Sequence, residues 1–96
     1  MSEGVEQEVS LRIRNRLGLH ARPAAEFVKV AGRYSADIRV AKDELEVNGK
    51  SIMGVLMLAA EQGTEITIRA SGDDASEALE ALSDLVRRGF DEAYEE

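Results

Sequence analysis

One histidine is the residue of this sequence with the clearest chemistry. His20 lies in the run Gly-Leu-His-Ala-Arg-Pro-Ala-Ala at residues 18–25, where the residue pattern changes to that of a helix. The first N–H groups of a helix have no intrahelical acceptor, and together with the helix dipole they attract anions. Pro23 agrees with a helix start, because a proline in the first turn forfeits no helical hydrogen bond.

This position suits transfer of a phosphoryl group. The positive helix end and the neighbouring Arg22 favour a neutral imidazole, whose nitrogen lone pair can attack phosphorus. The N–H groups of the first turn, at Ala21 and Arg22, would then hold the phosphoryl oxygens together with the Arg22 guanidinium. We therefore expect His20 to accept a phosphoryl group. The alternative is that His20 is an ordinary capping or surface residue.

Other kinds of site fit the sequence less well. The chain has one His and no Cys, so the usual nitrogen and sulfur ligands of a metal site are missing, and we expect neither a metal nor a cofactor. No Gly-x-Ser-x-Gly motif is present, and no nucleophile is paired with His20. Residues 49–51, Gly-Lys-Ser, match the end of a P-loop, but Glu44 stands where the first glycine of that loop belongs.

Composition indicates a single small domain. The 96 residues contain one Pro, no Cys and no apolar run long enough to cross a bilayer, and 44% hydrophobic residues suffice for one core. We expect one domain over residues 1–96, with a core at about 9–90 and an acidic tail at each end. No secretory leader is recognisable, so the cytoplasm is the expected location.

Charge is distributed unevenly along the chain. The net charge of −7 argues against a nucleic-acid binder, because Lys and Arg supply most phosphate-backbone affinity. The stretch from Arg12 to Arg22 is nevertheless basic and contains no acid. The acids gather near the two ends, at Glu3, Glu6, Glu8, Asp91, Glu92, Glu95 and Glu96. We expect a local basic patch around His20 and assign no role to the acidic ends.

Hydrophobic periodicity predicts the order of elements. Alternating patterns at residues 8–14, 36–40, 44–48 and 65–70 are typical of half-buried strands. Helical patterns follow Gly18 up to Gly32, run from 51 to 60, and begin again at Asp74. Asp74 and Glu77 are spaced almost as in a capping box. The buried stripe of this last helix is Ala78, Leu79, Leu82, Leu85 and Val86, with Arg87 and Arg88 at its C-terminal end.

The order β-α-β-β-α-β-α predicts an α+β fold. Strands that are apolar on one side only suit an antiparallel sheet with one solvated face better than a parallel sheet covered on both sides. We therefore expect an open-faced two-layer sandwich, in which a four-stranded, mostly antiparallel sheet carries three helices on one face.

The helix at 51–60 has more apolar side chains than one buried face requires. Val55 and Leu58 are expected in the core, which leaves Ile52, Met53 and Leu56 as an exposed apolar patch suited to partner binding. The alternative is that all of them are core residues. Ser51, directly before this helix, is predicted to be its N-cap.

Two segments of the chain resemble HPr, the histidine phosphocarrier family of the bacterial phosphotransferase system. They are Leu-Gly-Leu-His-Ala-Arg-Pro-Ala-Ala at 17–25 and Asn-Gly-Lys-Ser-Ile-Met-Gly-Val-Leu-Met-Leu at 48–58. The resemblance extends from about Val9 to Phe90. It implies phosphorylation of His20 on Nδ1 by enzyme I, transfer to IIA proteins or domains, and a phosphate-stabilising role for Arg22. It also implies that HPr kinase/phosphorylase modifies Ser51, and that the chain is a carrier rather than an enzyme.

Alternatives within and beyond this resemblance remain open. Residues 13–20 and the ending Arg-Gly-Phe-Asp-Glu at 88–92 are similar to NPr, the nitrogen-branch relative, which implies a regulatory carrier that binds partners according to its phosphorylation state. An RNA-binding module is a weaker alternative, because four aromatic residues and a net charge of −7 offer little for base stacking or phosphate contact. We expect a monomer without direct membrane insertion.

Overall fold

The computed structural model describes residues 6–92, so Glu3, Glu95 and Glu96 of the predicted acidic tails lie outside it. The order of elements along this part of the chain agrees with the predicted one and adds a short 3-10 helix after the last α-helix. The elements are β1 (Glu6–Arg12), α1 (Ala21–Ala31), β2 (Asp37–Lys42), β3 (Leu45–Asn48), α2 (Ile52–Met57), β4 (Glu65–Ser71), α3 (Ala75–Arg87) and η1 (Gly89–Asp91).

The four strands form one sheet in the order β1-β4-β2-β3, and every neighbouring pair is antiparallel. Ile68 in β4 faces Val9 of β1 on one side and Val40 of β2 on the other. The prediction of an antiparallel α+β sandwich is therefore confirmed. Since β4 lies inside the sheet although it is the last strand made, β1 is paired only with a segment more than fifty residues away.

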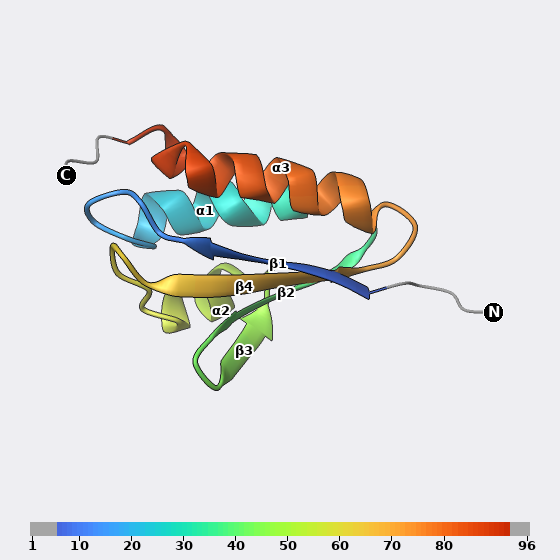
Figure 1. Ribbon diagram of the computed structural model, residues 1–96, viewed down its shortest axis with the longest axis horizontal. Helices are drawn as coiled ribbons and strands as arrows, with labels where there is room; N and C mark the ends of the chain where they lie inside the picture. The colour runs from blue at the N-terminus through green and yellow to red at the C-terminus, as the bar shows by residue number, and fades with distance from the viewer. Residues whose placement is uncertain (1–5, 93–96) are drawn as a thin grey trace.

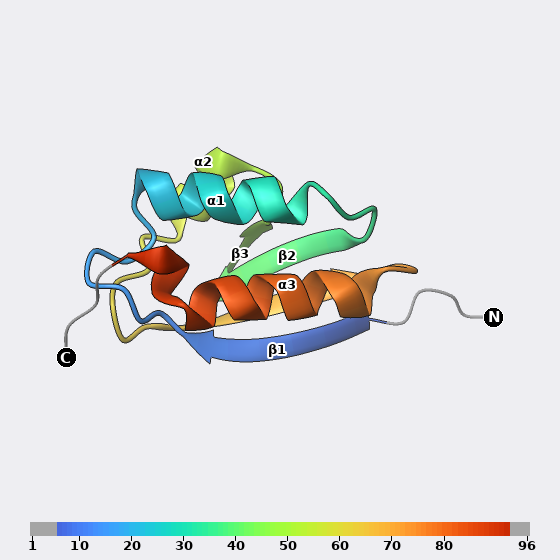
Figure 2. The same ribbon diagram turned by 90° about the horizontal axis from the view of Figure 1, so that it is seen from above.

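The helices lie on one side of this sheet and leave the other side to solvent. In Figure 1, α1 and α3 lie together above the sheet. In Figure 2, α2 lies on the side of α1 that is away from α3, and it contacts α1 and β3. Side chains of strands and helices meet in the core, where Phe27, Ile38, Ile68 and Leu82 are fully buried. The opposite face of the sheet is polar, because the alternate strand residues point there.

Helix α2 is shorter than predicted. The apolar pattern indicated a helix over 51–60, but the helix ends at Met57 with Leu58 as its C-cap. Ala59 has a left-handed φ of 49°, and the next carbonyl, of Ala60, accepts a hydrogen bond of 2.9 Å from the N–H of Leu19. The chain therefore leaves the helix in order to pair with the segment before α1, which local periodicity does not report.

Asp74 precedes α3 as predicted, but the predicted capping interaction is wrong. Its carboxylate makes no cap hydrogen bond; it accepts from the backbone N–H groups of Ser35 at 2.9 Å and Ala36 at 2.8 Å. These bonds hold the pKa of the Asp74 carboxyl below its usual value, and the bond from Ser35 has the largest effect. Asp74 thus joins the start of α3 to the start of β2.

The stripe predicted for α3 is buried as expected. Within residues 6–92, no helix has the length and apolar character needed to cross a membrane.

Candidate functional site

The segment that carries His20 is fastened to the turn between α2 and β4. We call residues 13–20 the site loop. Ile13 is buried, its N–H donates to the carbonyl of Thr64 at 2.9 Å, and its carbonyl accepts from Gly63 at 2.8 Å. At the other end of the loop, Leu19 is buried and bonded to Ala60. The loop therefore has a fixed path although it contains no regular structure.

Gly18 lies where the site loop comes close to the backbone of Ala60. Its φ is +68°, a left-handed conformation that favours glycine, and a Cβ atom there would lie 2.3 Å from the carbonyl oxygen of Ala60. Both the backbone conformation and the space exclude a side chain. Gly18 also offers its own carbonyl to the side-chain amide of Asn15, at 2.8 Å.

His20 is the N-cap of α1, one residue before the helix itself, and its backbone carbonyl accepts from Ala24 at 3.0 Å. Its side chain makes no cap hydrogen bond and is 37% exposed. The N–H groups of Ala21 and Arg22 belong to the first turn and have no intrahelical acceptor. The imidazole and these N–H groups therefore lie together at the positive end of an eleven-residue helix, where sequence reasoning expected them.

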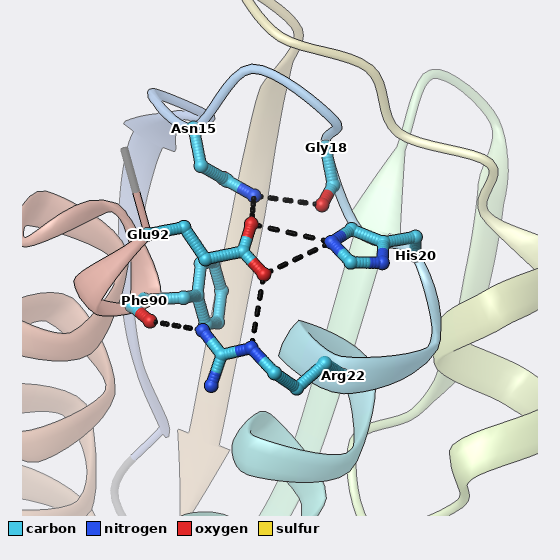
Figure 3. A network of polar contacts seen from close by, with 6 residues as sticks. All are labelled: Asn15, Gly18, His20, Arg22, Phe90 and Glu92. Carbon is cyan, nitrogen blue, oxygen red and sulfur yellow. Dashed lines mark hydrogen bonds and ion pairs between the residues drawn. The ribbon is translucent and has the colours of Figure 1, made fainter. Parts of the chain in front are cut away.

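The structure also places an acid beside His20, from the other end of the described chain. The carboxylate of Glu92 lies 3.0 and 3.2 Å from Nε2 of His20 (Figure 3). The same carboxylate accepts from Nε of Arg22 at 3.0 Å and from Nδ2 of Asn15 at 2.9 Å. Glu92 thus joins the site loop to the first turn of α1.

The surroundings of Glu92 favour its ionised form. Burial opposes its charge, since its side chain is only 17% exposed, but the hydrogen bonds from Asn15, His20 and Arg22 outweigh burial. The pKa of the Glu92 carboxyl is therefore lower than its ordinary value. Asn15 is fully buried, and its amide must point its nitrogen at Glu92 and Gly18, because both of these partners are acceptors.

A strained turn delivers Glu92 to this position. Gly89, Phe90 and Asp91 follow one another with positive φ values of 65°, 57° and 60°. Such backbone is costly for residues other than glycine and persists only when the surroundings hold it. Here the Phe90 side chain is buried, its carbonyl accepts from Arg22 at 2.6 Å, and Asp91 pairs with Arg88 at 3.0 Å.

The predicted basic patch separates into parts with different partners. Arg12 donates to the carbonyl of Gly63, and Arg14 reaches the carbonyl of Arg87. Arg22 donates to Glu92, the residue that also contacts His20. Sequence reasoning missed Glu92 and Asn15: the ending at 88–92 was visible, but no spacing rule connects residues 70 or more positions apart.

The apolar surface of α2 agrees with the prediction in part. Val55 and Leu58 are buried, whereas Ile52 and Met53 are 41% and 66% exposed. Leu56, predicted on the patch, is only partly exposed and packs against the core. Met57 takes its place at the surface, with 64% exposure. We call Ile52, Met53 and Met57 the apolar patch.

Ser51 is the N-cap of α2, as predicted. Its extended backbone precedes the helix, and its Oγ accepts a hydrogen bond of 3.1 Å from the N–H of Gly54. This capping role is typical of serine.

Within residues 6–92, no group of three or more His, Cys, Asp and Glu side chains could hold a metal ion. A hollow of about 730 Å³ lies on the polar side of the sheet, lined by residues such as Lys42, Glu46 and Arg69, and His20 is not part of it. His20 is instead a partly exposed group at a helix start, which a partner protein can reach from outside.

Comparisons with known proteins agree on one family. The family model described as "PTS HPr component phosphorylation site" matches residues 7–88. The phosphocarrier protein HPr of Pseudomonas aeruginosa is 51% identical over 85 residues, which cover 88% of this chain and 94% of that protein. The crystal structure of HPr-C-His from Thermoanaerobacter tengcongensis has a TM-score of 0.88 and 48% identity, and covers 91% of this chain and 98% of that one.

One similar structure bears on the oligomeric state. The crystal structure of an HPr dimer from Thermoanaerobacter tengcongensis has a TM-score of 0.72 and 49% identity, and covers 88% of this chain and 97% of that one. A dimer of this fold does not fit the expectation of a monomer.

The geometry around Gly18 yields a first prediction. We expect Gly18→Ala to lower the free energy of unfolding more than Gly63→Ala does. Both glycines have positive φ, which costs an alanine about 1–2 kcal/mol, but only at position 18 would the new Cβ meet backbone, since nothing lies within 4 Å of Gly63. Urea unfolding of both variants measures the difference, and equal losses would contradict the close approach of Gly18 to Ala60.

Proposed function

Since the chain belongs to the HPr family of phosphocarrier proteins, we propose that it accepts a phosphoryl group from enzyme I on Nδ1 of His20 and passes it to IIA proteins or domains. The observation that carries the proposal is the exposed imidazole at the start of α1, beside free helix N–H groups and Arg22. The protein acts as a stoichiometric carrier in the cytoplasm rather than as an enzyme with its own turnover.

The transfer step requires little from the carrier besides a nucleophile and a place for negative charge. The lone pair of Nδ1 forms a bond to phosphorus, the bond from phosphorus to the donor breaks, and its electron pair stays on the donor. The N–H groups of Ala21 and Arg22 receive the phosphoryl oxygens, and the helix dipole favours their charge.

Arg22 can assist without leaving Glu92. Its Nε bonds to Glu92 and one of its terminal nitrogens to the carbonyl of Phe90, while the other terminal nitrogen has no hydrogen bond among the described residues. That nitrogen remains available for a phosphoryl oxygen, and arginine is well suited to such a contact.

We expect one acid-labile, base-stable phosphate per chain after incubation with phosphoenolpyruvate and enzyme I, and none on His20→Ala. Arg22→Ala should be labelled more slowly, because it removes charge beside the site. Intact-mass spectrometry counts the phosphate, and circular dichroism checks that each variant is folded. Labelling of folded His20→Ala would refute the proposal, and an unchanged rate for Arg22→Ala would remove Arg22 from it.

The apolar patch is proposed as a docking surface for enzyme I and IIA partners. Three of the six residues of α2 are large apolar residues with exposed side chains, namely Ile52, Met53 and Met57. Methionine adapts to differently shaped partners, and exposed apolar area marks interaction surfaces.

Met53→Asp tests this surface. We expect binding to enzyme I to weaken about tenfold or more, as for loss of an interface anchor, with little change in Tm because the side chain is 66% exposed. Ser76→Asp adds the same charge at an exposed position in the first turn of α3, where Ser76 bonds to Gln7 of β1, and should leave binding unchanged. Calorimetry measures the affinities. A large loss of Tm in Met53→Asp would show that the side chain supports the fold instead.

Ser51 is proposed as a regulatory site for HPr kinase/phosphorylase. A phosphate of charge about −2 at the start of α2 would adjoin Ile52 and Met53 and oppose docking of a partner there. The helix would survive, because its N-terminus favours negative charge.

Ser51→Asp should therefore keep the fold and slow phosphorylation of His20 by enzyme I. Ser51→Ala is the matched control: it loses the cap, at a cost of about 1 kcal/mol, but should be phosphorylated at the normal rate. Initial rates and hydrogen exchange in α2 distinguish the two effects. A normal rate for Ser51→Asp, or no labelling of the wild type by the kinase with ATP, would leave Ser51 as a cap alone.

A regulatory carrier of the NPr type is the second candidate. The ending at 88–92 that resembles NPr is the segment that forms the strained turn and brings Glu92 to His20. Transfer from phosphorylated protein to IIA proteins of the sugar and nitrogen branches, measured side by side, separates the two candidates.

A further inference from the structure

We infer that Glu92 is a positioning residue, which makes Nδ1 rather than Nε2 the nitrogen of His20 that carries the phosphoryl group. The inference rests on the proposed function, because it specifies how the phosphoryl acceptor is prepared. Its starting point is the contact between the Glu92 carboxylate and Nε2, at 3.0 and 3.2 Å.

A carboxylate can only accept hydrogen bonds, so this contact requires a proton on Nε2. In the neutral ring the proton on one nitrogen leaves the lone pair on the other, and the nucleophilic lone pair is then on Nδ1. An acid that fixes the tautomer and orientation of a reactive imidazole is a known device of hydrolases. Here the hydrogen bonds to Glu92 lower the pKa of its carboxyl and so favour the carboxylate form that accepts from Nε2.

The position of Glu92 also leaves Nδ1 as the more accessible nitrogen of His20. Figure 3 shows one ring nitrogen directed at Glu92 and the other directed away from it. A donor's phosphorus could reach Nε2 only by displacing a carboxylate that is itself held by Asn15 and Arg22. Asn15 is fully buried, so the carboxylate is fixed from inside the protein.

Charge favours the same product. When Nδ1 of the neutral ring bonds to phosphorus while Nε2 keeps its proton, the ring becomes positively charged. The Glu92 carboxylate then pairs with a cation, and the phosphoryl group lies on the opposite side of the ring. The carboxylate and the phosphoryl group are thus separated by the positive charge that stabilises both.

Glu92→Ala tests the inference, with Asp91→Asn as matched control. Asp91 lies in the same turn at φ 60°, a conformation that asparagine tolerates, and its carboxylate pairs with Arg88 rather than His20. Each variant and the wild type are treated with phosphoramidate. The P–N bond of phosphoramidate breaks, its phosphoryl group is transferred to the histidine ring, and ammonia is released. ³¹P and ¹⁵N NMR then identify the two phosphohistidine isomers.

We expect wild type and Asp91→Asn to form the Nδ1 isomer, and the share of Nε2 isomer to rise about tenfold or more in Glu92→Ala, as for loss of a charge-assisted hydrogen bond. A hydrogen-bonded Nε2–H proton signal should be seen in the unmodified wild type and Asp91→Asn, and lost in Glu92→Ala. An unchanged isomer ratio in Glu92→Ala, or the same change in Asp91→Asn, overturns the inference. Faster labelling of Glu92→Ala with only the Nδ1 isomer also overturns it, because Glu92 would then merely occupy the site.

The two proposals fail in different ways. The Nε2–H signal and the reaction with phosphoramidate need no protein donor. If they behave as expected while enzyme I does not label the wild type, the proposed function fails and the positioning role of Glu92 stands. If enzyme I labels the wild type but the isomer ratio is the same with and without Glu92, the proposed function stands and the positioning role of Glu92 fails.

Discussion

The carboxylate of Glu92 is the interaction on which the arrangement of this site depends. It accepts hydrogen bonds from Asn15, His20 and Arg22, and these donors come from the site loop, the cap of α1 and its first turn. Without an acceptor, the amide nitrogen of buried Asn15 would lose one of its two partners, and a positively charged arginine would face the imidazole alone. One ionised group therefore accepts from the nitrogen of a buried amide, orients a ring and partly neutralises a guanidinium at the same time.

The layer arrangement explains why such a site can be both ordered and open. The helices cover one face of the sheet, and His20 lies where α1 begins, at an end of that layer rather than inside it. The order comes from backbone hydrogen bonds that fasten the site loop to residues 60–64, and from Gly18, which permits the close approach. The exposure of His20 leaves the core packing of α1 intact, because the buried residues of this helix lie further along it, at positions such as Ala24 and Phe27. The proposed phosphoryl acceptor is thus held in place and remains 37% exposed.

Local periodicity was sufficient to predict the type of each main element and the buried faces of β4 and α3. The alternation of Ile66 and Ile68 and the stripe on α3 predicted strand, helix and burial, because these properties depend on which face of one element is apolar. Helix ends were harder: α2 stops early because Ala60 bonds to a distant loop. The partner of His20 was beyond local reasoning, since it depends on a turn in which Phe90 and Asp91 adopt a conformation that neither residue prefers.

The pairing of β1 with β4, and of the site loop with Glu92, has a consequence for the order of biosynthesis. A chain emerging from the ribosome presents β1 and His20 first, but the strand that pairs with β1 follows much later, and Glu92 comes after every other described element. A nascent chain therefore displays the histidine before anything orients it. If Glu92 positions the ring as inferred above, only a chain made at least as far as residue 92 has the acceptor nitrogen of His20 selected.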